Sequence, residues 1–246
     1  MHNQTVLYIT LSSFEVTPMY FAINIIMIMA ALIAIVLNAG IICIILVEKE
    51  FDQDVPCILI KHLTVSDLIC AVLIIYTVTY NLVHYKVFME CLIRFGLLNG
   101  IFLNSSMLIF ALTVDRYIKI ISPYKYLQVF TPARDSKAVF INWIVCVFLC
   151  LLPVFGWYDQ RPSNHCSFFG VFPTTYRIVY AMTILTSVFP IIVMYVHIMT
   201  IAIKQQMNTF FQRPVSEGHS SAWWRPTKTT LFIVGTNIIT VVPPSK

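Results

Sequence analysis

Charged side chains are scarce in this sequence. Asp, Glu, Lys and Arg together make up 11% of its 246 residues, whereas a soluble domain carries roughly 25%. Hydrophobic residues make up 59%, so the balance excludes an ordinary soluble domain. We interpret the net charge of +5 as attraction to the lipids of an inner membrane leaflet, and we expect no nucleic-acid binding.

Signals for secretion and for catalysis are also lacking. No lysine or arginine precedes Lys49, so the basic first segment of a cleavable signal peptide is absent. The first apolar segment must therefore direct the chain to the membrane itself. No nucleophile–base arrangement, phosphate-binding loop or hydrolase motif occurs, and the histidines are scattered without metal-ligand spacing. The sequence thus predicts neither an enzyme nor a metal site.

Long apolar runs are what the sequence does contain. A helix needs about 20 such residues to cross a bilayer, and only helices satisfy their own backbone in lipid unless strands close into a barrel. The alternating pattern of a barrel is absent. We predict an all-α fold, a polytopic transmembrane helix bundle, with spans at about 19–47, 56–83, 88–121, 136–156, 174–207 and 226–243. A transporter or channel is the rival class, but no internal repeat is found and only one acid lies deep in a span.

Loop charge predicts the orientation. With residues 1–18 as an extracellular N-terminus, eleven cations lie inside: Lys49, Lys61, Arg116, Lys119, Lys125, Arg134, Lys137, Lys204, Arg213, Arg225 and Lys228. Five lie outside: Lys86, Arg94, Arg161, Arg177 and Lys246. Asn3 begins a glycosylation sequon that fits an extracellular end. Sidedness therefore places the N-terminus outside and the stretch around Arg116 in the cytoplasm.

The same sidedness sorts the seven cysteines. Only Cys91 and Cys166 face the oxidising exterior, where disulfides persist, so we predict that they form a disulfide rather than two free thiols. Cys91 lies 25 residues before Arg116, which is roughly 38 Å along a helix. One straight helix therefore spans from the outer cysteine to the inner arginine.

Asp67 lies near the middle of the second predicted span, where a charge costs about 2.5–3.5 kcal/mol. Ser105 of the third span lies at similar depth, and Asn38 of the first span is a plausible neighbour. Two interpretations stay open. Either these oxygens form a pocket for a small cation or a proton, or Asp67 is a neutral, hydrogen-bonded residue that ties helices together.

Taken as an ordered set, these features resemble the rhodopsin-like (class A) G protein-coupled receptors over about residues 20–243. The matching residues are Asn38, the LTVSD stretch at 63–67, Cys91, the triplet Asp115–Arg116–Tyr117, Trp143, Cys166 and Pro190. The resemblance implies a plasma-membrane receptor with an extracellular N-terminus. It implies a small-molecule ligand and a heterotrimeric G protein as partners, beside membrane lipids.

The resemblance also implies roles for single residues. In such receptors the arginine that matches Arg116 is restrained by its acidic neighbour, here Asp115, and contacts the G protein when it is released. The alternative is a plain interfacial salt bridge, which contributes little. The aspartate that matches Asp67 lines a sodium site with Ser105 in many members, so a sodium ion near Asp67 is the one candidate bound ion; no other cofactor is expected.

The ligand class follows from a few positions near the outer ends of the spans. Amine receptors carry an acid where this chain has Leu98, so an amine is disfavoured. Phe168 and Phe169 belong to the apolar stretch CSFFGVF, and Arg94 faces either the pocket mouth or, by snorkelling, the lipid headgroups. These stretches look most like the receptors that sense fatty-acid ethanolamides (the glucose-dependent insulinotropic receptor), and next like adenosine receptors. We therefore expect a lipid-like ligand.

The chain departs from the family pattern in its last segment. Asn237 and Val241 stand at aromatic positions of the sixth span, and Trp223 stands where an acid often faces the arginine. Six of the family's seven spans are expected within these 246 residues. The alternative function is a non-signalling six-span fragment or isoform that acts on full-length receptors.

Overall fold

The computed structural model describes residues 10–11, 18–47, 55–83, 86–158 and 166–212. The chain divides into two compact units, Met1–Tyr195 and Val196–Lys246. Of the second unit, the described part is the end of one helix. Every site discussed below lies in the first unit. The predicted span at 226–243 and the sequon at Asn3 lie outside the described residues.

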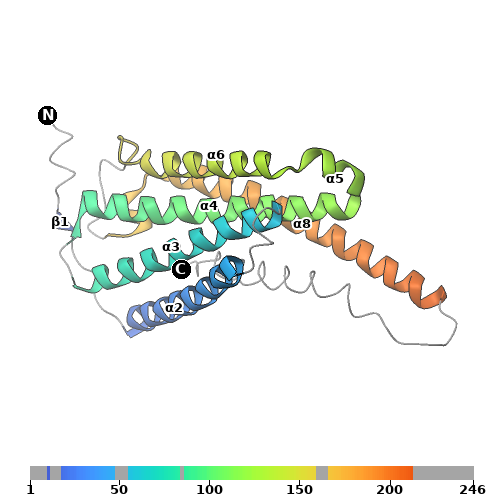
Figure 1. Ribbon diagram of the computed structural model, residues 1–246. Coiled ribbons are helices and arrows are strands. Elements are labelled where there is room, and N and C mark those ends of the chain that lie inside the picture. The colour runs from blue at the N-terminus through green and yellow to red at the C-terminus, as the bar shows by residue number, and fades with distance from the viewer. Residues whose placement is uncertain (1–9, 12–17, 48–54, 84–85, 159–165, 213–246) are drawn as a thin grey trace. The chain divides into compact units, whose positions relative to one another are not determined.

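Five long helices make up the described part of the chain (Figure 1). They are α2 (Pro18–Val47), α3 (Val55–Val83), α4 (Phe88–Ile121), α6 (Pro132–Leu151) and α8 (Thr174–Gln212). Two short helices join them, α5 (Pro123–Val129) and α7 (Phe168–Val171). The first three long helices begin and end within one residue of the predicted spans. This agreement arises because uninterrupted apolar runs define both, and the all-α prediction is confirmed.

One small strand pair was not predicted from the sequence. β1 (Thr10–Leu11) pairs antiparallel with β2 (Lys86–Val87), with Thr10 opposite Val87. Because β2 ends where α4 begins, this pair holds residues 10–11 beside the first turn of α4. Two residues a strand are too few to leave a periodic signal in the sequence.

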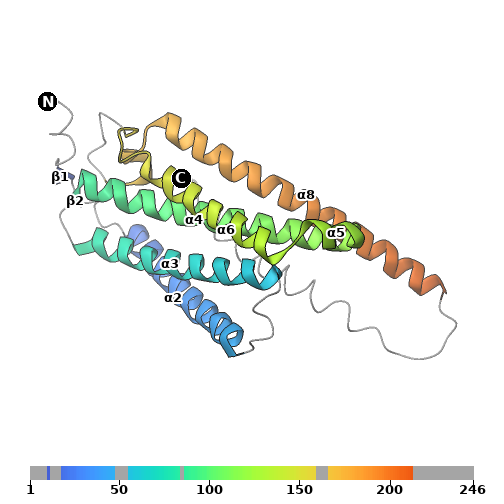
Figure 2. The ribbon, with the colours of Figure 1, turned by 45° about the horizontal axis from the view of Figure 1, so that its top comes forward.

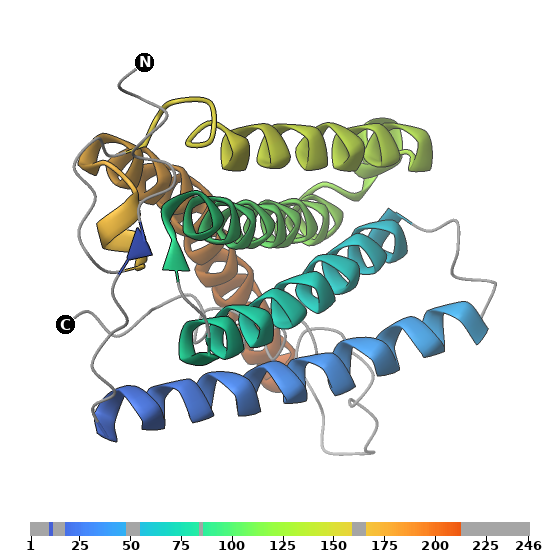
Figure 3. The ribbon, with the colours of Figure 1, turned by 90° about the vertical axis from the view of Figure 1, so that its left-hand side faces the viewer.

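α4 is the central helix of the first unit. It packs against α3 and α6, and α2 packs on the far side of α3, as the views in Figures 1, 2 and 3 agree. In its most apolar window 50% of the residues are buried, against 6% for α2. α4 therefore carries most of the buried polar groups, while α2 presents apolar side chains outward, as a lipid-facing helix does.

Close packing between α4 and α6 depends on small residues. A Cβ added at Gly96 of α4 would lie 2.8 Å from the Cys150 carbonyl oxygen of α6, so only glycine allows this approach. Cys146 and Cys150 are buried, unpaired thiols on the same face of α6. Such small-residue contacts are typical of helix pairs in membranes, where backbones approach closely.

The fourth predicted span differs most from its helix. The sequence predicted 136–156, whereas α6 begins at Pro132 and ends at Leu151. Proline favours a first helical turn, which explains the early start, and Pro153 lacks the N–H that would continue the helix, which explains the early end. Turns then carry the chain to Gly156, whose φ of 121° suits glycine.

Four described helices are long and apolar enough to cross a membrane: α2, α3, α4 and α8. α6 has charges in its first turns, and its uncharged part is correspondingly short.

Candidate functional site

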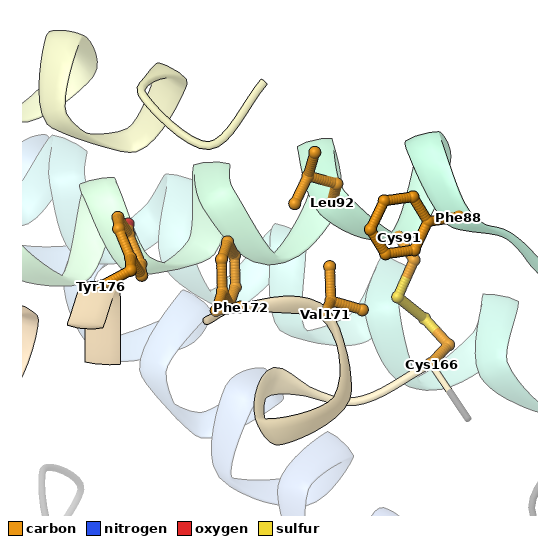
Figure 4. Packing of buried hydrophobic residues seen from close by; sticks show 7 residues of the cluster. All are labelled: Phe88, Cys91, Leu92, Cys166, Val171, Phe172 and Tyr176. Carbon is orange, nitrogen blue, oxygen red and sulfur yellow. A yellow bond between two sulfur atoms is a disulfide. The ribbon is translucent and has the colours of Figure 1, made fainter. Parts of the chain in front are cut away.

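A disulfide joins Cys91, in the first turn of α4, to Cys166, just before α7. Their Cα atoms are 6.0 Å apart. Both cysteines are buried with apolar side chains around them, as Figure 4 shows: Phe88, Leu92, Val171, Phe172 and Tyr176. The pairing expected from sidedness is therefore present. It fixes α7 and the residues around it to the start of α4, which we call the disulfide end of the bundle.

Arg94 lies one turn after Cys91 and is almost completely buried, with 3% of its surface exposed. Its Nε is 2.8 Å from Glu90 Oε1, in an ion pair between residues four apart on α4. The guanidinium also donates to the Thr77 carbonyl at 3.0 Å and to Cys166 Sγ at 3.1 Å. Arg94 thereby ties α3, α4 and the disulfide together.

This placement differs from both alternatives predicted for Arg94. The sequence suggested a lone cation at the pocket mouth or among lipid headgroups, but Glu90 already compensates the charge and Tyr80 covers it, with its ring centroid 4.9 Å from the guanidinium carbon. The signal that could have revealed this was Glu90 itself, because oppositely charged residues four apart meet on a helix.

The other three predicted pocket residues have different surroundings. Leu98 is half-buried, one turn beyond Arg94 on α4. Phe168 is half-buried, and its ring centroid lies 5.3 Å from that of Phe172. Phe169 is 76% exposed, and its carbonyl accepts a 2.8 Å hydrogen bond from Arg177. The structure thus places Phe168 in the packed aromatic cluster and leaves Phe169 at its exposed edge, with its ring centroid 5.5 Å from that of Phe168.

Asp67 and Ser105 do come together in the middle of the bundle. Ser105 Oγ lies 2.8 Å from Asp67 Oδ1 and 2.9 Å from Ser66 Oγ. The third predicted member, Asn38, instead donates to the Ala34 carbonyl of its own helix at 2.9 Å. The predicted set of three is therefore joined in part: α3 and α4 share these oxygens, while the Asn38 amide is engaged within α2.

Three further polar residues, Ser66, Asn104 and Asn142, extend this network, and none of them was a predicted site residue. Asn104 donates to Ser66 Oγ at 3.0 Å, and Asn142 of α6 donates to Asn104 Oδ1 at 2.8 Å. Ser66 and Asn104 are fully buried. Buried polar groups need partners, so each asparagine or serine inside an apolar run was a readable signal. The network links α3, α4 and α6 at one depth.

At the opposite end of α4, which we call the Asp115 end, the carboxylate of Asp115 is fully buried. Tyr126 donates a 2.8 Å hydrogen bond to its Oδ1. Arg116 Nε lies 3.9 Å from Oδ2 and makes no hydrogen bond to it. Tyr117 is half-buried. The predicted Asp115–Arg116 pair is thus a loose electrostatic contact, and the hydrogen bond that positions Asp115 comes from a residue that sequence reasoning did not single out.

Tyr126 reaches Asp115 because α5 folds back against α4. Pro123 begins α5, and the Tyr126 ring stacks on Phe130 with centroids 5.1 Å apart. Lys119 Nζ lies 5.4 Å from the centroid of the same ring. The contacts with Phe130 and Lys119 hold the phenol where it can donate to the buried carboxylate.

These features are matched by a known family. The profile of the 7 transmembrane receptor (rhodopsin family) matches residues 37–245. The chain belongs to this family. Membership of the rhodopsin family explains the long apolar helices. Members of this family are multi-pass receptors and not enzymes.

The curated relatives include more than one kind of receptor within this family. This rhodopsin-family chain is 27% identical to cannabinoid receptor 1 of Taricha granulosa over 141 residues, which cover 55% of the chain and 29% of that receptor. It is 30% identical to cannabinoid receptor 1 of Xenopus laevis over 119 residues, 46% of the chain and 24% of that receptor. It is 33% identical to 5-hydroxytryptamine receptor 1A of Xenopus laevis over 136 residues, 52% of the chain and 33% of that receptor. The matched part thus spans about a quarter to a third of these relatives.

The contact between Tyr126 and Asp115 predicts how this receptor chain responds to alkali. Burial, and then the hydrogen bond to Asp115, raise the pKa of Tyr126 above its ordinary value near 10. The folded chain therefore holds this proton more tightly than the unfolded chain does. Stability from Tyr126 is fully present below about pH 10 and is lost as the pH rises further.

We expect Tyr126→Phe to lower the melting temperature at pH 8, and the gap to the parent to narrow at pH 11. Thermal unfolding of the purified chain at the two pH values measures this. Tyr124→Phe is the matched control, because Tyr124 lies on the same short helix and is 88% exposed. If the difference in melting temperature between Tyr126→Phe and the parent is the same at pH 11 as at pH 8, the contact with Asp115 does not raise the pKa of Tyr126.

Proposed function

We propose that this chain forms part of a receptor in the plasma membrane, with its N-terminus extracellular, that transmits a lipid-like small-molecule signal to a heterotrimeric G protein. Membership of the rhodopsin family supports the receptor function. The ligand class rests on one observation above all: half-buried Leu98 stands where amine receptors carry an acid. Without that acid, an ammonium group has no charged partner at this position.

The relatives point in two directions, and the residues favour one of them. The cannabinoid receptors favour a lipid-like ligand, whereas 5-hydroxytryptamine receptor 1A favours an amine. Leu98 and the aromatic cluster around Phe168 offer apolar surface, which binds acyl chains through the hydrophobic effect. We place the acyl part of the ligand against these two residues. A fatty-acid ethanolamide is the first compound to test, and adenosine is the second.

Arg94 and Phe169 take different parts in this proposal from those expected from sequence alone. Since Glu90 compensates Arg94, we assign the guanidinium to holding the pocket wall, with any contact to a ligand head as a secondary role. Phe169 is exposed at the disulfide end, where it would meet a ligand at entry. In this proposal the apolar contacts with Leu98 and the cluster around Phe168 supply most of the ligand affinity.

Two further elements of the proposal lie deeper in the bundle. The oxygens of Asp67, Ser105 and Ser66 form the kind of donor set that hard cations prefer, so a sodium ion would be held there. Among the described residues, no group of three His, Cys, Asp or Glu gathers that could hold another metal. At the Asp115 end, we propose that Arg116 contacts the G protein, with Asp115 and Tyr117 beside it.

The test is a ligand panel in cells that lack related receptors, with G-protein activation as the readout. The whole product of the gene is expressed beside the 246-residue chain. We expect the whole product to respond to a fatty-acid ethanolamide and not to 5-hydroxytryptamine or adenosine, and the 246-residue chain to give no signal. If the shorter chain lowers the surface level of the whole product, the non-signalling role is supported instead.

Leu98→Ala should weaken the lipid response about tenfold, since burying a leucine side chain contributes about 1.5–3 kcal/mol and 1.4 kcal/mol is a factor of ten. Leu97→Ala is the matched control, because this neighbouring leucine is exposed on another side of α4. Equal loss in both variants, or activation by an amine, would reject the proposed ligand class.

A further inference from the structure

Asn99 of α4 carries an amide that the fold leaves without a hydrogen bond. Its Nδ2 is buried, and among the described residues it has no hydrogen-bond partner. It follows directly after Leu98, which the proposed function places against the ligand. Buried polar groups are nearly always paired, because an unpaired one forfeits the hydrogen bonds that it makes in water. The folded chain therefore holds a donor here that does not serve to join its helices.

The other asparagines whose side chains the structure describes all use this donor. Asn24 and Asn38 of α2 donate to carbonyls four residues earlier in their own helix. Asn104 and Asn142 donate to residues of neighbouring helices. The amide of Asn99 takes neither route. The unpaired donor is therefore a property of this position and not of asparagine in these helices.

Aromatic side chains border Asn99 on the side of α8. The Tyr180 hydroxyl donates to the Asn99 backbone carbonyl at 3.3 Å, and the Tyr180 ring centroid lies 6.1 Å from that of Phe168. Tyr176 stacks between Tyr180 and Phe172, at 6.4 Å and 4.7 Å between centroids. Figure 4 shows Tyr176 and Phe172 within the buried cluster. One donor beside an extended apolar surface is typical of small-molecule sites, where a few polar groups fix the orientation of the ligand.

The chemistry of the donor selects the group that it can bind. An amide N–H needs a hydrogen-bond acceptor, whereas an ammonium group offers only donors. A carboxylate would bring a negative charge to an apolar surface without a free cation, since Arg94 is already paired with Glu90. The carbonyl of an amide or an ester accepts a hydrogen bond and carries no charge. Neutral acyl compounds therefore fit Asn99 best.

We propose that Asn99 Nδ2 donates a hydrogen bond to the carbonyl oxygen of a neutral acyl ligand, an amide or an ester, whose chain lies against Leu98 and the cluster around Phe168. This assignment rests on the proposed lipid-like ligand and adds the group by which the receptor recognises it. The carbonyl, and not the chain alone, then determines which lipids activate the receptor.

The test compares two neutral lipids on the whole product of the gene, with G-protein activation and surface level measured in the same cells. N-Oleoylethanolamide carries the carbonyl, whereas oleyl hydroxyethyl ether keeps the chain and the hydroxyl without it. We expect the parent to respond to the amide at about tenfold lower concentration than to the ether, the effect of one hydrogen bond to a buried donor. Asn99→Leu keeps the branched shape without polar atoms, and it should respond to both lipids at the same concentration.

Thermal unfolding of the purified 246-residue chain in detergent separates this role from a structural one. Without ligand, Asn99→Leu should unfold at the temperature of the parent or above it, because it removes an unpaired buried donor. Asn104→Leu is the matched control on the same helix. Its amide is hydrogen-bonded on both atoms, so this variant should unfold at a lower temperature than the parent.

Three results would overturn the assignment of Asn99 and leave the lipid-like ligand standing. They are equal potency of the amide and the ether on the parent, an unchanged preference for the amide in Asn99→Leu, and a melting temperature of Asn99→Leu as low as that of Asn104→Leu. If the parent responds to neither lipid, the lipid-like ligand itself is wrong, and the assignment of Asn99 fails with it.

Discussion

Replacing Arg94 by alanine should destabilise the folded chain by about 3 kcal/mol, the lower end of the range for removing one partner of a buried ion pair. The lower end applies because the Glu90 side chain is 24% exposed and can be partly rehydrated. The variant also leaves the Thr77 carbonyl and Cys166 Sγ without their donor. Thermal unfolding in detergent, followed by tryptophan fluorescence, measures the loss.

The matched control is Arg177→Ala. Arg177 lies in the first turn of α8, and its guanidinium donates to the Phe169 carbonyl and to Thr174, but these bonds are exposed. Its loss should cost well under 1 kcal/mol, as is usual for exposed polar contacts. A double-mutant cycle with Glu90→Gln then isolates the pair. If Arg94→Ala and Arg177→Ala unfold at the same temperature, the burial of Arg94 does not stabilise the chain.

Arg94 also shows which features could be predicted from sequence. The long helices followed from uninterrupted apolar runs, because a span in lipid must be a helix. The disulfide followed from sidedness, because only two cysteines faced outward. The direction of a single side chain has no such constraint. Arg94 could have faced the pocket, the lipid or the bundle, and only the packing of α3 and the Cys166 segment around it decided the outcome.

The network around Asp67 could be predicted from the sequence only in part. A buried acid requires partners, which made Ser105 a sound prediction at matching depth. Asn38 failed to reach Asp67 because an asparagine inside a helix can satisfy its amide on a carbonyl four residues earlier. Asn142 joined instead because α6 approaches α4 closely at Gly96 and Gly100. Such an approach depends on tertiary packing, which hydropathy does not encode.

The Asp115 end leads to the second large prediction, which applies to the whole receptor. Arg116→Ala should abolish G-protein activation at unchanged surface expression, because this arginine is the proposed contact. Asp115→Asn should raise basal signalling by about fivefold at most, since a loose pair whose arginine is 32% exposed contributes about 1 kcal/mol or less. The modest size agrees with the 3.9 Å separation of the two charges. Activation and surface level are measured in the same cells.

The hydrogen bond from Tyr126 makes Asp115→Asn a clean test of charge. Asparagine keeps the oxygen that accepts from the phenol at 2.8 Å, so α5 stays docked while the attraction to Arg116 is lost. Lys125→Ala is the control, because this exposed cation on α5 lies outside the pair and should leave basal signalling unchanged. If Asp115→Asn lowers basal signalling at equal expression, the carboxylate does not restrain Arg116. Its buried position would then serve only to hold α5 against α4 through Tyr126.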